Sequence, residues 1–172
     1  NAVTMRRAAE AFRAAIAADS SFAPAYIGLA DALFQQSRVY WDPEPREAVP
    51  AALELLLRAQ QLDPSLADTY TSQGWYYYGY ARDYDRALAS HERAIQLAPG
   101  EALAYTGYAF PLVATGLPDS ALAVARRARD LEPLNPMVVS TQCWIQYLAD
   151  RLGEAHATCK FVTDSIDATF KV

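Results

Sequence analysis

The side chains with the most potential for chemistry are two histidines and two cysteines. His156 and Cys159 are one helical turn apart, and Cys143 would lie nearby on a facing helix, so the sequence offers three candidate metal ligands. A closed structural site takes four ligands, and we therefore expect no bound metal. His91 lies between two alanines of a helix face, where we expect a packed, hydrogen-bonded imidazole rather than a catalytic base.

Two cysteines are too few for a disulfide framework. Because Cys143 and Cys159 are expected on facing helices of the same helix pair, a bridge between them is geometrically conceivable. Buried free thiols that act as small apolar residues are the interpretation that we favour.

Known catalytic motifs are missing from the sequence. It contains no glycine-rich phosphate loop, no Gly-x-Ser-x-Gly elbow and no His-Glu-x-x-His helix. We therefore predict that the chain is not an enzyme and binds no cofactor.

The helices that must position these residues are predicted by a repeated sequence motif. It consists of an alanine, a larger residue, a second alanine and a polar residue at the helix end. Alanines seven residues apart mark a helix face that another helix approaches closely, and the proline that follows ends the helix. The copies span residues 52–64, 87–99 and 121–133, and an earlier, weaker copy spans 8–19.

The spacing of these copies predicts an all-α chain of helix pairs. We expect one domain over residues 1–172, in which no complete cap covers either end. Its divisions are a partial repeat (1–22), a repeat with a loop insertion (23–66) and three further repeats (67–101, 102–135 and 136–169).

Self-similarity at about 34 residues, with each unit a helix pair, resembles the tetratricopeptide repeat (TPR). The run from Tyr26 to Ala32, the loop from Pro45 to Pro50 and the tryptophan Trp144 resemble, more narrowly, the repeats of bacterial signalling proteins. Those proteins carry winged-helix, adenylate-cyclase-like or Ser/Thr kinase effector domains. The resemblance implies an α-solenoid with a right-handed superhelix. Because such solenoids need polar caps and neither end has one, we expect a segment of a longer protein.

Each repeat consists of a first and a second helix, and the resemblance also implies which residues of the first helices face the concave groove. Most are aromatic or uncharged, and the lysine and asparagine that hold acidic chaperone tails in such repeats are missing, so we do not expect that ligand class. The predicted peptide-binding groove consists of Ile27, Asp31, Phe34, Thr71, Trp75, Tyr78, Thr106, Phe110, Val113, Ser140, Trp144 and Tyr147.

An aromatic groove of this kind predicts a protein-interaction or sensing module that binds an apolar peptide or helix. Two alternatives remain open: tight curvature of the solenoid buries the rings as core, or the chain is a self-association module that forms homo-oligomers. An enzyme is the least favoured function.

Charge and hydropathy restrict the partners further. A net charge of -5 and a pI near 5.0 argue against nucleic acid, which needs clustered cations. The sequence contains no run of 18 apolar residues, so we expect no membrane span in this segment. We expect the cytoplasm, or the periplasm if a membrane helix precedes the segment in its parent protein.

Three local features carry further expectations. Gln73, Gln142 and Gln146 stand at usually apolar places and predict looser packing. Residues 38–50 are expected to form an ordered loop, with Tyr40 and Trp41 packed back onto the repeats. Pro111 lies inside a predicted helix and is expected to kink it.

Overall fold

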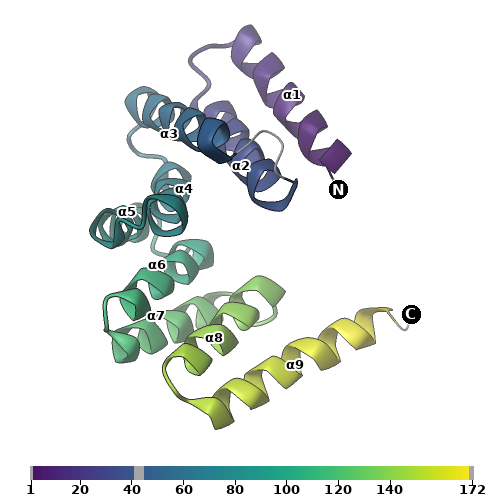
Figure 1. The fold of residues 1–172 in the computed structure, drawn as a ribbon, viewed down its shortest axis with the longest axis vertical. Coiled ribbons are helices and arrows are strands. Elements are labelled where there is room, and N and C mark those ends of the chain that lie inside the picture. The colour runs from purple at the N-terminus through teal and green to yellow at the C-terminus, as the bar shows by residue number, and fades with distance from the viewer. Residues whose placement is uncertain (1, 41–44, 171–172) are drawn as a thin grey trace.

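The structure is a computed structural model that describes the backbone of residues 2–40 and 45–170, and the side chains of residues 3–37 and 47–164. Within these ranges the secondary structure is entirely helical (Figure 1). The elements are α1 (Ala2–Ala18), α2 (Ala23–Tyr40), α3 (Pro45–Leu62), α4 (Ala67–Tyr76), the π-helical turn η1 (Tyr77–Ala81), α5 (Tyr84–Leu97), α6 (Ala102–Ala114), α7 (Pro118–Leu131), α8 (Pro136–Leu148) and α9 (Leu152–Phe170).

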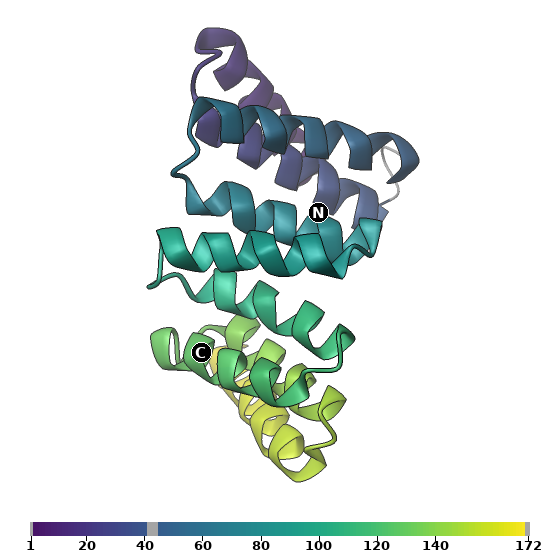
Figure 2. The same cartoon turned by 90° about the vertical axis from the view of Figure 1, so that its left-hand side faces the viewer.

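The helices stack as successive antiparallel pairs, α2 with α3, α4 with α5, α6 with α7 and α8 with α9, and α1 packs on α2. Figures 1 and 2 show these pairs as layers of one curved array. The first helices α2, α4, α6 and α8 also touch one another in order, so they line the inner side of the curve. The predicted all-α solenoid is confirmed.

Three of the second helices end where the repeated motif predicted. The helices α3, α5 and α7 stop at Leu62, Leu97 and Leu131, and a proline follows two residues later each time. Proline cannot continue a helix, because it lacks the backbone donor and its ring crowds the preceding turn.

A tyrosine near the start of three first helices fixes each helix to the turn before it. Its hydroxyl donates to the backbone carbonyl oxygen of the residue six places earlier, at 3.0–3.1 Å. The pairs are Tyr26 with Ser20, Tyr70 with Pro64 and Tyr105 with Pro99.

The loop predicted for residues 38–50 of the first complete repeat is wrong, because most of these residues are helical. The extra residues lengthen both helices, because α2 runs on to Tyr40 and α3 begins at Pro45. Proline suits a first helical position, whose backbone donor has no partner in any case. Pro50, the last residue of the expected loop, lies inside α3. The packing expected of Tyr40 and Trp41 concerns side chains outside the described ones.

The second repeat has one residue more than the 34 of the third, and η1 accommodates it. A π-helical turn adds a residue without ending the helix. The insertion lies in the sequence Tyr-Tyr-Gly-Tyr-Ala, directly before the turn to α5.

The turns between the helices of the last three repeats share a left-handed residue. These residues are Arg82 (φ 54°), Gly116 (φ 81°) and Asp150 (φ 60°), and they are spaced 34 residues apart. A left-handed conformation brings Cβ close to the following carbonyl oxygen, so glycine adopts it most readily.

We predict that Arg82→Gly stabilises the chain by about 0.5–1 kcal/mol, because it relieves this strain at a modest entropic cost in the unfolded state. Gly116→Ala is the matched control and should destabilise the chain by a similar amount: its backbone is left-handed too, and nothing within 4 Å of the added Cβ adds a steric clash to that strain. Urea denaturation measures both effects. A destabilised Arg82→Gly variant would contradict the argument.

Each of the three glutamines forms a hydrogen bond across a helix interface, and the looser packing expected around them stays a prediction. Gln73 donates to Gln60 at 2.9 Å, Gln142 accepts from Arg129 at 3.3 Å, and Gln146 donates to a carboxylate of α9 at 3.5 Å. These bonds satisfy some of the polar groups that would be costly to bury alone, but the buried Oε1 of Gln146 has no partner within the described residues.

Pro111 is buried inside α6, and the helix continues past it to Ala114. The hydroxyl of Thr115 donates to the Pro111 carbonyl at 2.9 Å near the end of the helix. The kink at Pro111 stays a prediction.

Candidate functional site

Three aromatic rings from α4, η1 and α6 meet at the centre of the inner side. Phe110 lies 5.5 Å from Trp75 and 5.8 Å from Tyr78, and the latter two are 6.3 Å apart, all between ring centroids. All three side chains are half-buried. Burial also raises the pKa of the Tyr78 hydroxyl. This set, called the central ring cluster below, is part core and part surface.

The other predicted rings lie in separate groups. Phe34 of α2 packs edge-on against Tyr80 at 4.9 Å. Trp144 and Tyr147 of α8 lie 6.0 Å apart and are 58% and 56% exposed. The surface expected as one aromatic groove is therefore divided into three ring groups along the inner side.

Two of the predicted groove residues are almost completely buried. Thr106 is only 1% exposed, and its hydroxyl donates to the Ala102 carbonyl at 2.9 Å, so it presents no surface to a partner. Ile27 is buried in a core cluster of α2 and α3. Val113 is half-buried against the core of α6 and α7, and Ser140 of α8 is half-buried.

The N-terminal half of the inner side contains a hollow of about 380 Å³ between α1, α2, α4 and α6. Asp31, Asp68 and Glu101 line it, together with the hydroxyl residues Thr71 and Ser72. We call this cavity the acidic hollow. None of the residues that line it is basic.

Desolvation raises the pKa of Asp31 to about 6, even though its side chain remains open to the water in the hollow. A hydrogen bond from Ser72 opposes the rise, and the negative charge of Asp68 adds to it. This direction is the one expected for a carboxylate without a nearby cation.

His91 of α5 is fully buried, and neither ring nitrogen has a hydrogen-bond partner within the described structure. The prediction of a packed imidazole is confirmed, but the prediction that it is hydrogen-bonded is wrong. Burial lowers the pKa of His91 to about 3, so the ring is neutral at physiological pH. A buried ring without partners has no group to orient it as a base.

Glycines make the room for this imidazole. A Cβ added to Gly74 or to Gly107 would overlap the ring, and Trp75 covers it edge-on at 5.8 Å. The contact with Gly107 spans sixteen residues and joins one repeat to the next. Phe12 contacts Gly28, which is also sixteen residues away in the sequence. Leu56 and Ser72, again sixteen residues apart, line one small void between α3 and α4.

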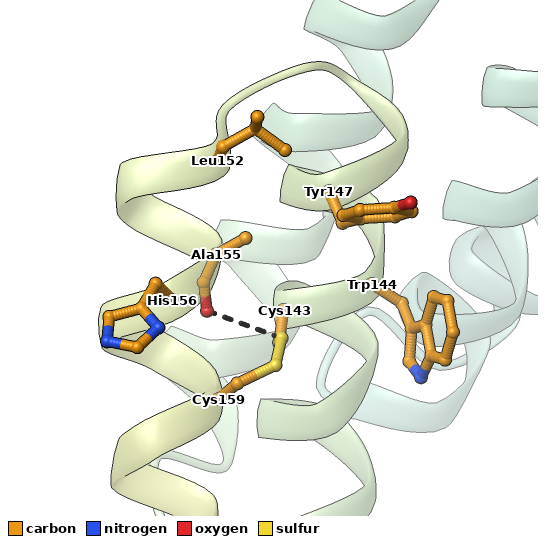
Figure 3. Close-up of a pocket in the computed structure, with 7 residues that line it drawn as sticks. All are labelled: Cys143, Trp144, Tyr147, Leu152, Ala155, His156 and Cys159. Atoms are coloured by element: carbon orange, nitrogen blue, oxygen red, sulfur yellow. Dashed lines mark hydrogen bonds between the residues drawn. A yellow bond between two sulfur atoms is a disulfide. The ribbon is translucent and has the colours of Figure 1, made fainter.

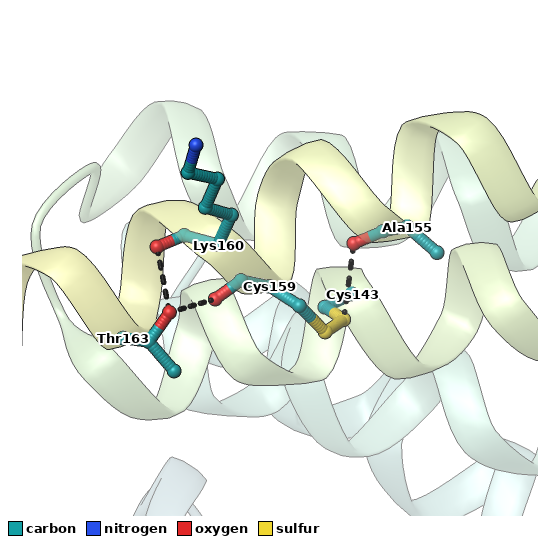
Figure 4. The surroundings of a disulfide bond; sticks show 5 residues. All are labelled: Cys143, Ala155, Cys159, Lys160 and Thr163. Carbon is teal, nitrogen blue, oxygen red and sulfur yellow. Dashed lines mark hydrogen bonds between the residues drawn. A yellow bond between two sulfur atoms is a disulfide. The ribbon is translucent and has the colours of Figure 1, made fainter.

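Cys143 and Cys159 are joined in a disulfide between α8 and α9 (Figure 4). The prediction of free thiols is wrong. Their Cα atoms are 5.4 Å apart, which suits a disulfide, because the two residues occupy facing places of one helix pair. In the second repeat the corresponding places hold Gly74 and His91, which also touch.

The disulfide forms one wall of an apolar pocket of about 400 Å³ in the last repeat. Figure 3 shows Trp144 and Tyr147 on α8 and Leu152 and His156 on α9 around it. Because both sulfur atoms are bonded to each other, they are not thiolate ligands, and the part of the chain described holds no group of three candidate metal ligands.

No helix within the described ranges is both long enough and apolar enough to cross a membrane.

Sequence reasoning missed Asp68 and Glu101 of the acidic hollow, because only first-helix places known to face a groove were considered. Both positions could have been found from the repeat pattern, because Asp68 lies in the first turn of α4 and Glu101 directly precedes α6. The disulfide also had a signal: its sixteen-residue spacing equals that between Ala109 and Ala125, which meet in a core cluster of the third repeat.

No family model matches the chain, and no curated protein matches it. Solved structures do. TTC0263, a thermophilic TPR protein of Thermus thermophilus, has a TM-score of 0.72 at 21% identity over 84% of this chain and 74% of its own. PilW, a type IV pilus biogenesis factor, has a TM-score of 0.75 at 19% identity over 95% of this chain and 70% of its own. YrrB, a TPR protein with an unusual peptide-binding site, has a TM-score of 0.59 at 18% identity over 94% of this chain and 77% of its own. The chain therefore has the fold of a tetratricopeptide-repeat solenoid.

Proposed function

We propose that the chain is a protein-interaction module whose inner side binds an extended or helical peptide. The observation that carries the proposal is the row of incompletely buried rings on successive first helices, from Phe34 through the central ring cluster to Trp144 and Tyr147. Aromatic side chains bury a large area at low entropic cost, and they are frequent anchors at interfaces. The fold shared with the peptide-binding protein YrrB agrees with this function.

Trp144 and Trp75 are expected to behave differently when replaced. Trp144→Ala should weaken peptide binding by about 2 kcal/mol or more, roughly thirtyfold, with an unchanged melting temperature, because the ring is mostly exposed. Trp75→Ala should also lower the melting temperature, because Trp75 covers the buried His91. Peptides selected from a displayed random library on the immobilised chain provide the probe, and fluorescence anisotropy gives the affinities.

Leu134→Ala is the matched control, since this residue is 78% exposed in the turn between α7 and α8, away from the rings. It should leave binding unchanged. If the library yields no binding peptide, or if Trp144→Ala and Leu134→Ala bind equally well, the inner side is not the interaction surface that we propose.

The parent protein is a further part of the proposal. The resemblance to the repeats of bacterial signalling proteins supports a sensing segment attached to a transcriptional or enzymatic effector domain. The disulfide supports an oxidising compartment such as the periplasm over the cytoplasm expected from sequence, because disulfides persist there and are rare in reducing compartments.

Self-association is the second candidate function, and apolar side chains on the last helix pair favour it. Leu148, Leu152 and Phe161 are all exposed there. Sedimentation at rising protein concentration tests this second function, since a chain that stays monomeric at high concentration does not self-associate.

A further inference from the structure

The acidic hollow lies directly beside the central ring cluster. Asp31 and Ser72 line the hollow and also a small void of about 20 Å³ that reaches Phe34 and Trp75. A peptide that lies on the ring of Trp75 is therefore within side-chain reach of the carboxylates.

Three layers of the solenoid contribute these carboxylates. Asp31 comes from the middle of α2, Asp68 from the first turn of α4, and Glu101 from the residue that precedes α6. The apolar part of the lining includes Phe12, Ile27 and Leu103. The hollow thus offers an anionic floor next to apolar walls, which suits a cation on an aliphatic stem.

Electrostatics favour such an occupant over a neutral or acidic one. No basic residue lines the hollow, and the negative charge of Asp68 adds to the cost of ionising Asp31. A cation placed between them would reverse that cost, whereas an acidic peptide would add to it.

We propose that the peptide bound on the inner side carries a lysine or arginine that enters the acidic hollow, next to an apolar residue that packs on the central ring cluster. This inference rests on the proposed function and adds the chemistry of the partner. The interaction is a charge-assisted one in a partly desolvated site, so it should contribute to specificity as well as affinity.

The test is a selection of random displayed octapeptides on three forms of the full chain. The first is the wild type, and the second carries Asp31→Asn, Asp68→Asn and Glu101→Gln, which preserve side-chain shape. The third carries Asp85→Asn, Asp119→Asn and Asp130→Asn on the outer helices α5 and α7, which changes the net charge equally. Melting temperatures establish that all three forms are folded.

Lysine or arginine should be enriched in peptides selected on the wild type and on the outer-helix control, but not in those selected on the hollow variant. The affinity of a selected peptide should fall at least about tenfold in the hollow variant, and to a similar degree when its arginine is replaced by neutral citrulline. Enriched apolar peptides without a cation would overturn this inference and leave the proposed function standing. Enrichment of no peptide would overturn both.

Discussion

Replacing Gly107 with alanine is expected to destabilise the chain by about 2 kcal/mol, because the added Cβ overlaps the buried ring of His91. The ring has little room to move, since Gly74 contacts it from the same repeat and Trp75 covers it. Alanine has the better helix propensity by about 1 kcal/mol, so the steric cost must exceed that gain. Urea denaturation followed by circular dichroism measures the difference.

Two further variants make this result specific. Gly153→Ala should be neutral or slightly stabilising, because nothing lies within 4 Å of its added Cβ. His91→Ala in combination with Gly107→Ala should cost less than the sum of the single changes, because the overlap is then gone. Additive costs in this double-mutant cycle would show that Gly107 is needed for another reason.

Breaking the disulfide is expected to cost about 3 kcal/mol, as for a bridge that closes a loop of this length. The bridge spans sixteen residues and joins the two helices of the last repeat, so its loss enlarges the unfolded ensemble and loosens α9. Dithiothreitol should therefore lower the melting temperature of the wild-type chain to that of a variant with Cys143→Ser and Cys159→Ser. The same reductant should leave the variant unchanged.

Thiol titration of the chain unfolded without reductant provides an independent measurement. A disulfide leaves no reactive thiol, whereas two reactive thiols per chain and an unchanged melting temperature in dithiothreitol would contradict the bridge. That outcome would also remove the support for an oxidising compartment.

The sequence was sufficient to predict the fold because its main signals are local. Proline two residues after α3, α5 and α7 and alanines seven apart specify helix ends and contact faces without knowledge of distant residues. The first repeat was mispredicted because Pro43, Pro45 and Pro50 suggested a loop, whereas proline is also tolerated at helix starts, and Pro50 lies inside α3 as an exposed residue.

The candidate site was only partly predictable, because burial depends on neighbouring layers. Thr106 and Trp144 occupy places that were both assigned to the groove, yet the first is covered by its neighbours and the second is exposed. The carboxylates of Asp68 and Glu101 join Asp31 only when the curvature brings three layers together. Peptide binding by this surface stays a prediction.

The sixteen-residue contacts between successive repeats imply that the order of the repeats is fixed. Phe12 meets Gly28 and His91 meets Gly107, so in both contacts a bulky residue on one side is matched by a glycine on the other. Removing residues 102–135 would preserve the helical phase of the array but would bring His91 against Thr141, where no space is provided for the ring. Units of nearly equal length are thus not interchangeable modules, and any duplication or exchange of a repeat during evolution would have required changes on both sides of the new junction.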